Sequence, residues 1–339
     1  MRGLTLIHQY MKHSRTTILF FMMLGAFVVM SIFLPDKFLT LSNFQSMASQ
    51  IPEFGLLSIA IMLAMLTGGI DLSIVSIANL AGVCAALILT KSSFPQLGGY
   101  EEVFKIILAM SSAILISLLC GLINGLLIAY IKVTAILATL GTMSIFSGIA
   151  IVVTKGYGIQ GFPEKFLFIG SGTIFDIPMP LIIFIFSIVI MSVILNRLSY
   201  GFNLYMLGSN PIAASFSGIN NRGVLIRTYV LSGFYSGLAS IIMISRVNSI
   251  RPGYGSTYLL QGILVCVLGG VDPSGGYGTI SGLVIGIIML QILQSGFNIL
   301  SFSPFFKNVI WGVMLILIMV LNFYNVRYSQ KLRKLRTEQ

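Results

Sequence analysis

Charged side chains are scarce in this sequence. Only 9% of its 339 residues are Asp, Glu, Lys or Arg, while 56% are hydrophobic. A soluble domain carries roughly 25% charged residues. The scarcity of charge therefore excludes a soluble globular fold and favours a protein embedded in a lipid bilayer.

The residues that catalysis and nucleotide binding require are also scarce. The two histidines, His8 and His13, precede the first apolar run, and no H-E-x-x-H or C-x-x-C motif occurs. The sequence contains no Gly-Lys pair, so it has no P-loop for ATP phosphates. The three cysteines, Cys84, Cys120 and Cys266, lie in apolar stretches without metal-ligand spacing and are interpreted as buried side chains. We therefore expect neither catalysis nor a metal or cofactor bound by this chain.

Long apolar runs, in contrast, recur along the whole chain. A bilayer core about 30 Å thick needs about 20 apolar residues per helix, and unbroken runs such as Leu181–Leu195 lack the alternation of a membrane-spanning strand. The first run is too long for the core of a cleaved signal peptide and is interpreted as an anchor. We predict an all-α, single-domain membrane protein over residues 1–339, with about ten spanning helices near residues 16–34, 51–67, 74–90, 105–128, 134–154, 177–195, 228–245, 259–268, 279–300 and 306–325.

The net charge of +11 has two explanations. A basic surface can bind nucleic acid, but here the basic residues follow the predicted topology. With the N-terminus inside, twelve of the twenty Lys and Arg residues fall in cytoplasmic segments, including the basic tail at 326–339 beside anionic lipid. The predicted outer segments hold the other eight, with six acidic residues that include Glu53. We therefore predict that both termini are cytoplasmic and that nucleic acid is not a partner.

Asp71 is the main charged residue at membrane depth. An ionisable side chain there is costly unless it is paired or hydrated, and it often marks a functional site. Gly68 and Gly69 free the backbone just before it, which allows a helix to break. Gly68, Gly69, Asp71 and Ser73 are therefore candidates for a gate in a membrane path. The alternative is that Asp71 is the N-cap of the apolar helix that begins near Ile74.

Uncharged polar side chains supply a second candidate site. Gln291, Gln294 and Asn298 are separated by three and four residues and therefore share one face of a helix. Asn124 and Gln261 also lie in or beside apolar runs. These side chains could hydrogen-bond a hydroxylated solute along a path, or they could hold neighbouring helices together.

Glycines mark two further features. Gly278, Gly282 and Gly286 have a spacing of four, which predicts a close helix-packing face. The run Gly68–Asp71 has the same pattern as Gly269–Asp272, with two glycines, a branched apolar residue and an aspartate. Transporters often contain internal repeats, but four residues only suggest one.

The longest predicted cytoplasmic loop contains the signals of a short helix. Asn210 suits an N-cap, Pro211 suits the first helical position and Gly218 suits the helix end. A short helix at the inner membrane face could dock a soluble partner or merely connect two spans. The predicted outer loop at 155–176 could likewise meet a delivery partner or cap the bundle.

Three ordered motifs carry a resemblance to one family over essentially the whole chain: Leu66–Ser73, Gly208–Ile219 and Leu268–Thr279. At these residues the sequence resembles the ribose and simple-sugar permeases of bacterial ABC importers, a family that includes the autoinducer-2 permeases. The resemblance implies a multi-pass protein of the bacterial inner membrane that admits a monosaccharide or a sugar-like solute. It also implies a second permease subunit, identical or paralogous, a cytoplasmic ATPase that holds the ATP, and a periplasmic sugar-binding protein.

The resemblance also identifies segment 208–220 as the helix that couples to the ATPase. Its candidate coupling residues are Gly208, Asn210, Ala213, Ala214, Ser217 and Gly218.

The chain departs from the pattern of many of these permeases. Leu259 and Gln261 stand where acidic residues are common, and Tyr277 and Phe202 stand where an arginine is frequent. It therefore resembles a side branch, which leaves the solute open. Two other function classes also stay open on the sequence: an ion-coupled secondary sugar carrier that works alone, and a membrane scaffold without transport.

Overall fold

The computed structural model describes residues 2–90 and 100–337, and these are mostly helical. The long helices of this part are α1 (Arg2–Phe33), α3 (Leu41–Leu66), α4 (Ile74–Thr90), α5 (Glu101–Ala129), α6 (Ala135–Thr154), α8 (Met179–Arg197), α11 (Asn221–Val247), α12 (Thr257–Leu268), α13 (Ile280–Ile299) and α14 (Pro304–Thr337). The shorter helices are α2 (Pro35–Phe38), α7 (Glu164–Ser171), α9 (Ser199–Ser209) and α10 (Pro211–Phe216). The strands β1 (Ile159–Gln160) and β4 (Ser249–Ile250) pair antiparallel, as do β2 (Thr173–Ile174) and β3 (Ile177–Pro178).

The predicted helical membrane fold is confirmed, and each of the ten predicted spans contains a helix. Among the described residues, six helices are long and apolar enough to cross a bilayer: α3, α5, α6, α8, α11 and α13. The other four predicted spans coincide with shorter apolar stretches, Thr17–Phe33, Ile74–Thr90, Thr257–Leu268 and Pro304–Val320. The number of crossings therefore stays a prediction. Three helices extend well beyond the predicted spans: α1 begins at Arg2 and not near residue 16, α3 begins at Leu41 and not near residue 51, and α14 ends at Thr337 and not near residue 325.

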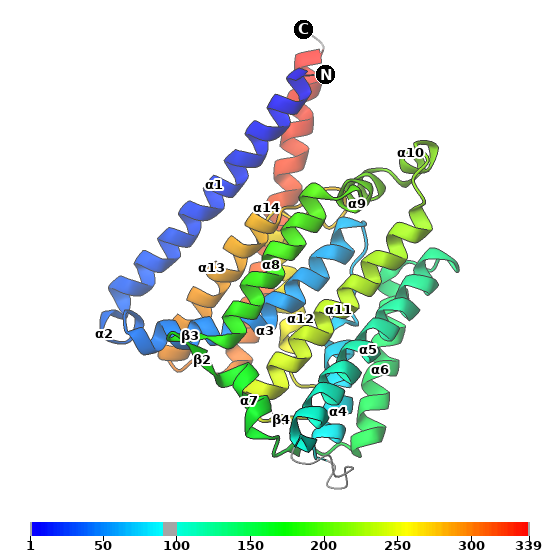
Figure 1. Cartoon of the computed structure of the whole chain (residues 1–339). Helices are drawn as coiled ribbons and strands as arrows, with labels where there is room; N and C mark the ends of the chain where they lie inside the picture. Colours follow the sequence, from blue (N-terminus) through cyan, green and yellow to red (C-terminus); the bar gives the residue numbers. More distant parts are fainter. Residues whose placement is uncertain (1, 91–99, 338–339) are drawn as a thin grey trace.

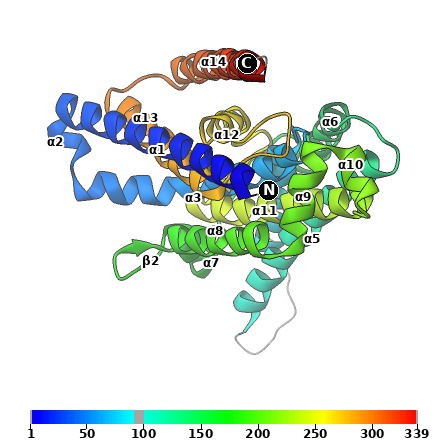
Figure 2. The ribbon, with the colours of Figure 1, turned by 90° about the horizontal axis from the view of Figure 1, so that it is seen from above.

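The centre of the bundle is formed by α3 and α11. In α3, 83% of the apolar window is buried, against 28% in α5, α6 and α8. Seen from above, α14 lies at one edge and α7 with α8 near the opposite edge, with α3 and α11 between them (Figure 2). The apolar side chains that the outer helices expose suit lipid tails, which are as apolar as leucine.

Small residues let the central helices approach closely. A methyl group on Gly121 of α5 would collide with the Tyr229 carbonyl oxygen of α11. Two of the three glycines of the predicted packing face pack as expected, because a methyl group on Gly282 would collide with the Gly269 carbonyl oxygen and Gly286 also lies against α12. Gly278 precedes α13 and faces the side chains of Leu66 and Val271 instead. Such contacts bring main chains together in membranes, where apolar side chains gain little by leaving lipid.

The two ends of the molecule differ in what they carry (Figure 1). We name one end the inner end. It carries α10 and the terminal portions of α1 and α14, which lead to the two ends of the chain. The opposite end, named the outer end, carries the β1–β4 pair, in which Ile159 lies opposite Ile250. Both termini therefore lie on the side of α10, as the charge pattern predicts; that this side is cytoplasmic stays a prediction.

Glu53, which the charge pattern counts with the outer segments, lies in the bundle and not in a solvated loop. Because α3 begins at Leu41, Glu53 lies well inside the helix, and it is fully buried. Its carboxylate pairs with the guanidinium of Arg246 on α11. A charge of this kind is tolerated in the bundle because a partner of opposite sign and further hydrogen bonds replace water.

Candidate functional site

Three chain segments meet at the inner end of the bundle. They are the loop between α3 and α4, the end of α9, and the loop between α12 and α13. The amide of Gly276 donates a hydrogen bond to the Leu66 carbonyl oxygen at 3.0 Å. A methyl group on Gly208 would collide with that same oxygen, and one on Gly275 would lie 2.6 Å from the amide nitrogen of Gly68. We name Gly68, Gly208, Gly275 and Gly276 the glycine junction.

Main-chain contact of this kind requires glycine for two reasons. Gly68, Gly275 and Gly276 have φ angles of 82°, 93° and 72°, a region that residues with a Cβ avoid. Gly208 is helical but has no room for a side chain. The hydroxyl of Tyr205, one turn earlier on α9, donates to the Gly278 carbonyl oxygen at 2.9 Å and adds a side-chain tie to the same loop.

The two loops of the junction have matching local structure. At the end of α3, the amide of Gly69 bonds to Ala64 O, five residues back, and at the end of α12 the amide of Val271 bonds to Cys266 O in the same way. These are the helix-ending bonds of Schellman turns. The same kind of turn thus ends both helices, but it falls one residue later in the second copy of the sequence pattern, and the end of α3 contacts residues 274–276 and not the turn after α12.

The match extends to the aspartate of each loop. Asp71 Oδ1 accepts a hydrogen bond from the amide of Ser73, and Asp272 Oδ1 accepts one from the amide of Ser274, each at 2.9 Å. The environments differ, because Asp71 is fully buried whereas Asp272 is partly exposed. Both carboxylates thus accept hydrogen bonds within their own loops, and a neighbouring helix adds a contact to Asp71 through Ser232.

Asp71, Ser73 and Asn124, three of the predicted path residues, come together in one buried polar cluster. Asp71 Oδ1 also accepts a hydrogen bond from the Ser73 hydroxyl at 2.7 Å, and the Asn124 side-chain amide of α5 donates to that hydroxyl at 2.7 Å. Ser232 of α11 approaches Asp71 Oδ2 at 3.5 Å. The first residue of α4 is Ile74, and Ile77 donates to the Ser73 carbonyl oxygen, so Ser73 and not Asp71 occupies the cap position. The cluster fixes the turn into α4; a gate role for Asp71 stays a prediction.

The predicted amide stripe lies elsewhere, on α13. Gln291 Nε2 approaches Gln50 Oε1 of α3 at 3.4 Å, and Lys307 of α14 donates to Asn298 Oδ1. These contacts tie helices within the chain and agree with the helix-packing alternative, while a solute path along the stripe stays a prediction. Within the described part, the buried amide oxygens without a hydrogen-bond partner on α12 and α13 are those of Gln261, Gln291 and Gln294.

The short helix signalled at Asn210 is present as α10. Asn210 Oδ1 accepts hydrogen bonds from the amides of Ile212 and Ala213, both at 3.0 Å. Ala214 is fully buried, whereas the side chains of Ile212 and Phe216 are 70% and 90% exposed. Two exposed apolar side chains on one projecting turn are typical of a contact surface.

The remaining coupling candidates hold α10 in place. The Ser217 hydroxyl donates to the Ala213 carbonyl oxygen at 2.9 Å, and Gly218 follows with a left-handed φ of 80°. The side-chain amide of Asn221, at the start of α11, donates to the Pro211 carbonyl oxygen at 2.8 Å. The helix is therefore braced from both ends while its apolar side chains stay exposed.

Sequence reasoning missed the contacts of the junction and the pairing of Glu53. The glycines were visible as motifs, but nothing in one sequence says that Gly208 touches Leu66, which lies 142 residues earlier by their numbers. The signal for Glu53 was its position inside a predicted span, which the charge count overrode.

An apolar bundle with interrupted helices that meet at one end, next to a braced and projecting short helix, has the construction of a membrane transport protein. The chain belongs to the family described as branched-chain amino acid transport system / permease component, which it matches over residues 43–319.

The comparison with individual relatives covers most of the chain. It is 35% identical over 303 residues to the ribose import permease protein RbsC of Bacillus subtilis, covering 88% of this chain and 91% of that protein. It is 32% identical over 308 residues to the L-arabinose transport system permease protein AraH of Escherichia coli, covering 91% and 89%. The autoinducer 2 import system permease protein LsrD of Yersinia enterocolitica is 29% identical over 272 residues, covering 78% and 79%. No solved structure matches the chain.

These relatives confirm the predicted resemblance and the predicted class. The chain is a transporter permease subunit and not an enzyme. The relatives also favour this interpretation over the ion-coupled carrier.

Proposed function

We propose that this protein is the permease subunit of an ATP-driven importer that admits a monosaccharide or a sugar-like solute. The printed names of its relatives, which include ribose, arabinose and galactose permeases, support the solute class. We further propose ten membrane crossings in a bacterial inner membrane, with both termini and α10 in the cytoplasm. The positive charge of the predicted inner segments supports this orientation.

The single observation that supports the mechanism best is the glycine junction. The last residues of α9 touch the loop after α3 and the loop after α12, and α10 follows α9 directly. A push on α10 by a cytoplasmic ATPase would therefore reach two interrupted helices through main-chain contacts that cannot be compressed. Packed elements of this kind move as rigid bodies between discrete arrangements.

The other partners follow from the same proposal. A second permease subunit, identical or paralogous, would complete the path, and a periplasmic sugar-binding protein would deliver the solute at the outer end. The chain itself has no P-loop, so ATP would be bound by the partner ATPase. Buried amides such as Gln261 and Gln294 supply groups that hydrogen-bond hydroxyls, which suits an uncharged polyol.

Uptake measurements test this proposal. Cells that lack the chain should lose uptake of at least one radiolabelled pentose or hexose, and the chain restored from a plasmid should recover it. The purified chain in liposomes should not take up that sugar with an ion gradient alone, and should do so with its ATPase, binding protein and ATP. Uptake by the chain alone would favour the ion-coupled carrier, and unchanged uptake of every sugar in the deletion cells would contradict sugar import.

A further inference from the structure

Glu53 is the centre of a buried cluster of paired groups. Its carboxylate is fully buried and accepts hydrogen bonds from Arg246 Nε at 2.5 Å and from Arg246 Nη2 at 3.0 Å. The Tyr258 hydroxyl donates to Glu53 Oε2 at 2.7 Å. The cluster joins three helices, because Glu53 lies on α3, Arg246 on α11 and Tyr258 on α12.

Arg246 and Tyr258 flank a single loop at the outer end. The loop, residues 247–257, begins at the last residue of α11 and ends where α12 starts. Glu53 therefore holds the chain just before this loop and just after it, so that one carboxylate closes the base of the loop.

The middle of the loop is held by weaker contacts. The Asn79 side-chain amide of α4 donates to the Tyr254 carbonyl oxygen at 2.9 Å. Asn248 has a left-handed φ of 53°, and its Oδ1 accepts a hydrogen bond from the amide of Phe162 at 2.9 Å. Neutral hydrogen bonds of this kind contribute about half as much as charge-assisted ones, so each bond from Arg246 to Glu53 contributes more than either of these two, while the buried Ile250 and the β1–β4 pairing also hold the middle of the loop.

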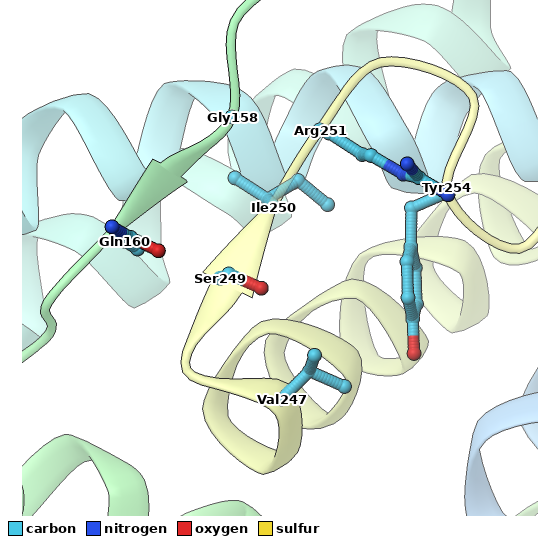
Figure 3. A pocket seen from close by; sticks show the side chains of 7 residues that line it. All are labelled: Gly158, Gln160, Val247, Ser249, Ile250, Arg251 and Tyr254. Carbon is cyan, nitrogen blue, oxygen red and sulfur yellow. The ribbon is translucent and has the colours of Figure 1, made fainter.

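The loop forms most of the wall of a cavity at the outer end. The cavity has a volume of about 510 Å³, within the range of small-molecule sites. Five of its seven lining residues belong to the loop and two belong to the β1 segment (Figure 3): Val247, Ser249, Ile250, Arg251 and Tyr254, with Gly158 and Gln160. The loop and the β1 segment are joined by the two-residue pairing of β1 with β4.

We propose that Glu53 is a positioning residue that fixes both ends of the loop 247–257 and thereby sets the shape of the outer cavity of the permease. It acts through Arg246 and Tyr258 and does not itself touch the cavity. Any role of this cavity in transport rests on the proposed function, since the cavity opens at the end opposite α10. The structural effect, a loop that loosens when the carboxylate is removed, is independent of the proposed function.

A thiol placed on the loop tests the proposal. The Ile250 side chain is 1% exposed, so the variant Ile250→Cys should react slowly with a maleimide when the permease is purified in lipid nanodiscs. Adding Glu53→Gln removes the buried carboxylate and leaves Arg246, whose side chain is 27% exposed, without its anionic partner, which weakens the charge-assisted bonds at the base of the loop. We expect the labelling rate to rise about tenfold, which corresponds to a loss of about 1.4 kcal/mol from the closed loop.

Two controls separate this effect from general damage. Glu102→Gln removes the surface pair with Lys165, whose atoms lie 3.1 Å apart with both side chains exposed, and should leave labelling of the Ile250→Cys thiol unchanged because exposed pairs contribute little. Glu53→Asp keeps the charge and should restore part of the protection, which a mere loss of packing would not predict. The chain without an added thiol measures background labelling of Cys84, Cys120 and Cys266.

Tyr258→Phe decides the question if Glu53→Gln does not accumulate. It removes one hydrogen bond to a charged group and leaves the ion pair, so labelling should rise by a smaller factor, about threefold or more. Unchanged labelling in whichever variant accumulates would overturn the proposal. A rise in labelling with no sugar uptake by the parent importer would instead contradict the proposed function and leave the role of Glu53 intact.

Discussion

At the scale of the residue, some positions of this fold require glycine because a neighbouring main chain occupies the space of a side chain. Gly208 illustrates this, because its Cα faces the Leu66 carbonyl oxygen with no space for a methyl group. The helix around it would accept alanine, since alanine is the best helix former. The need for glycine therefore comes from the neighbouring main chain and not from the backbone of α9.

We expect Gly208→Ala to separate docking from transport. The added methyl group must push α9 away from the loop after α3, at a cost of about 1–3 kcal/mol or more for overpacking, while α10 keeps its cap and its exposed side chains. ATPase binding in a pull-down should therefore be retained while sugar uptake falls, by about tenfold. Gly141→Ala on α6 is the matched control, because a methyl group there meets nothing within 4 Å; equal loss of uptake in both variants would contradict the junction.

Single residues also show where sequence reasoning ends. It placed Asp71 at membrane depth, because one acidic residue in a charge-free stretch is conspicuous. It could not supply Ser232, 161 residues later, as a neighbour of that carboxylate. The charge count includes Glu53 with the outer segments although the residue falls inside the predicted span 51–67, and only the packing of α3 against α11 reveals that it is buried.

At the scale of the element, helix placement was the most predictable feature. Every predicted span contains a helix, because apolar length is a strong local signal. The helix α10 was also predictable, since Asn, Pro and Gly specify its start and its end. The packing of α10 against its neighbours could not be predicted. Ala214 is buried while Ile212 and Phe216 are exposed, and this difference depends on how α9 and α11 approach α10.

If the exposed face of α10 binds the ATPase, a charge placed on that face should weaken binding. Ala213 is exposed, so Ala213→Glu should fold normally, remain in the membrane, and lower ATPase recovery in a pull-down by about tenfold or more, because a charge is placed in an apolar contact. The buried neighbour supplies the contrast: Ala214→Glu should instead reduce the amount of permease in the membrane. Normal ATPase recovery with Ala213→Glu would contradict the docking role.

At the scale of the whole molecule, the arrangement gives the permease two unlike ends. The inner end is built from main-chain contacts between loops, and the outer end is closed by short strand pairs and a charged cluster. Lipid-facing helices such as α5, α6 and α8 surround a buried pair, α3 and α11. None of this arrangement could be read from apolar runs, because they give the length of each helix but not its neighbours.

The orientation of the two ends can be measured with single cysteines. Phe175, in the turn between β2 and β3, is 95% exposed, and Phe216 on α10 is 90% exposed. We expect Phe175→Cys to react in intact spheroplasts with a membrane-impermeant maleimide, and Phe216→Cys to react only after the membrane is opened, since the positive segments lie inside. The reverse pattern would invert the topology, and labelling of both in closed cells would contradict a single orientation.

The pairing of Glu53 with Arg246 also constrains the order of biogenesis. The two residues are 193 positions apart, so at a synthesis rate of about 5–20 residues per second the carboxylate waits roughly 10–40 s for its partner to leave the ribosome. During that interval α3 is already made, and its carboxylate needs water or another partner, since a lone charge in hydrocarbon is costly. We therefore expect the newly made α3 to reach its final position only when α11 arrives, before α12, α13 and α14 follow.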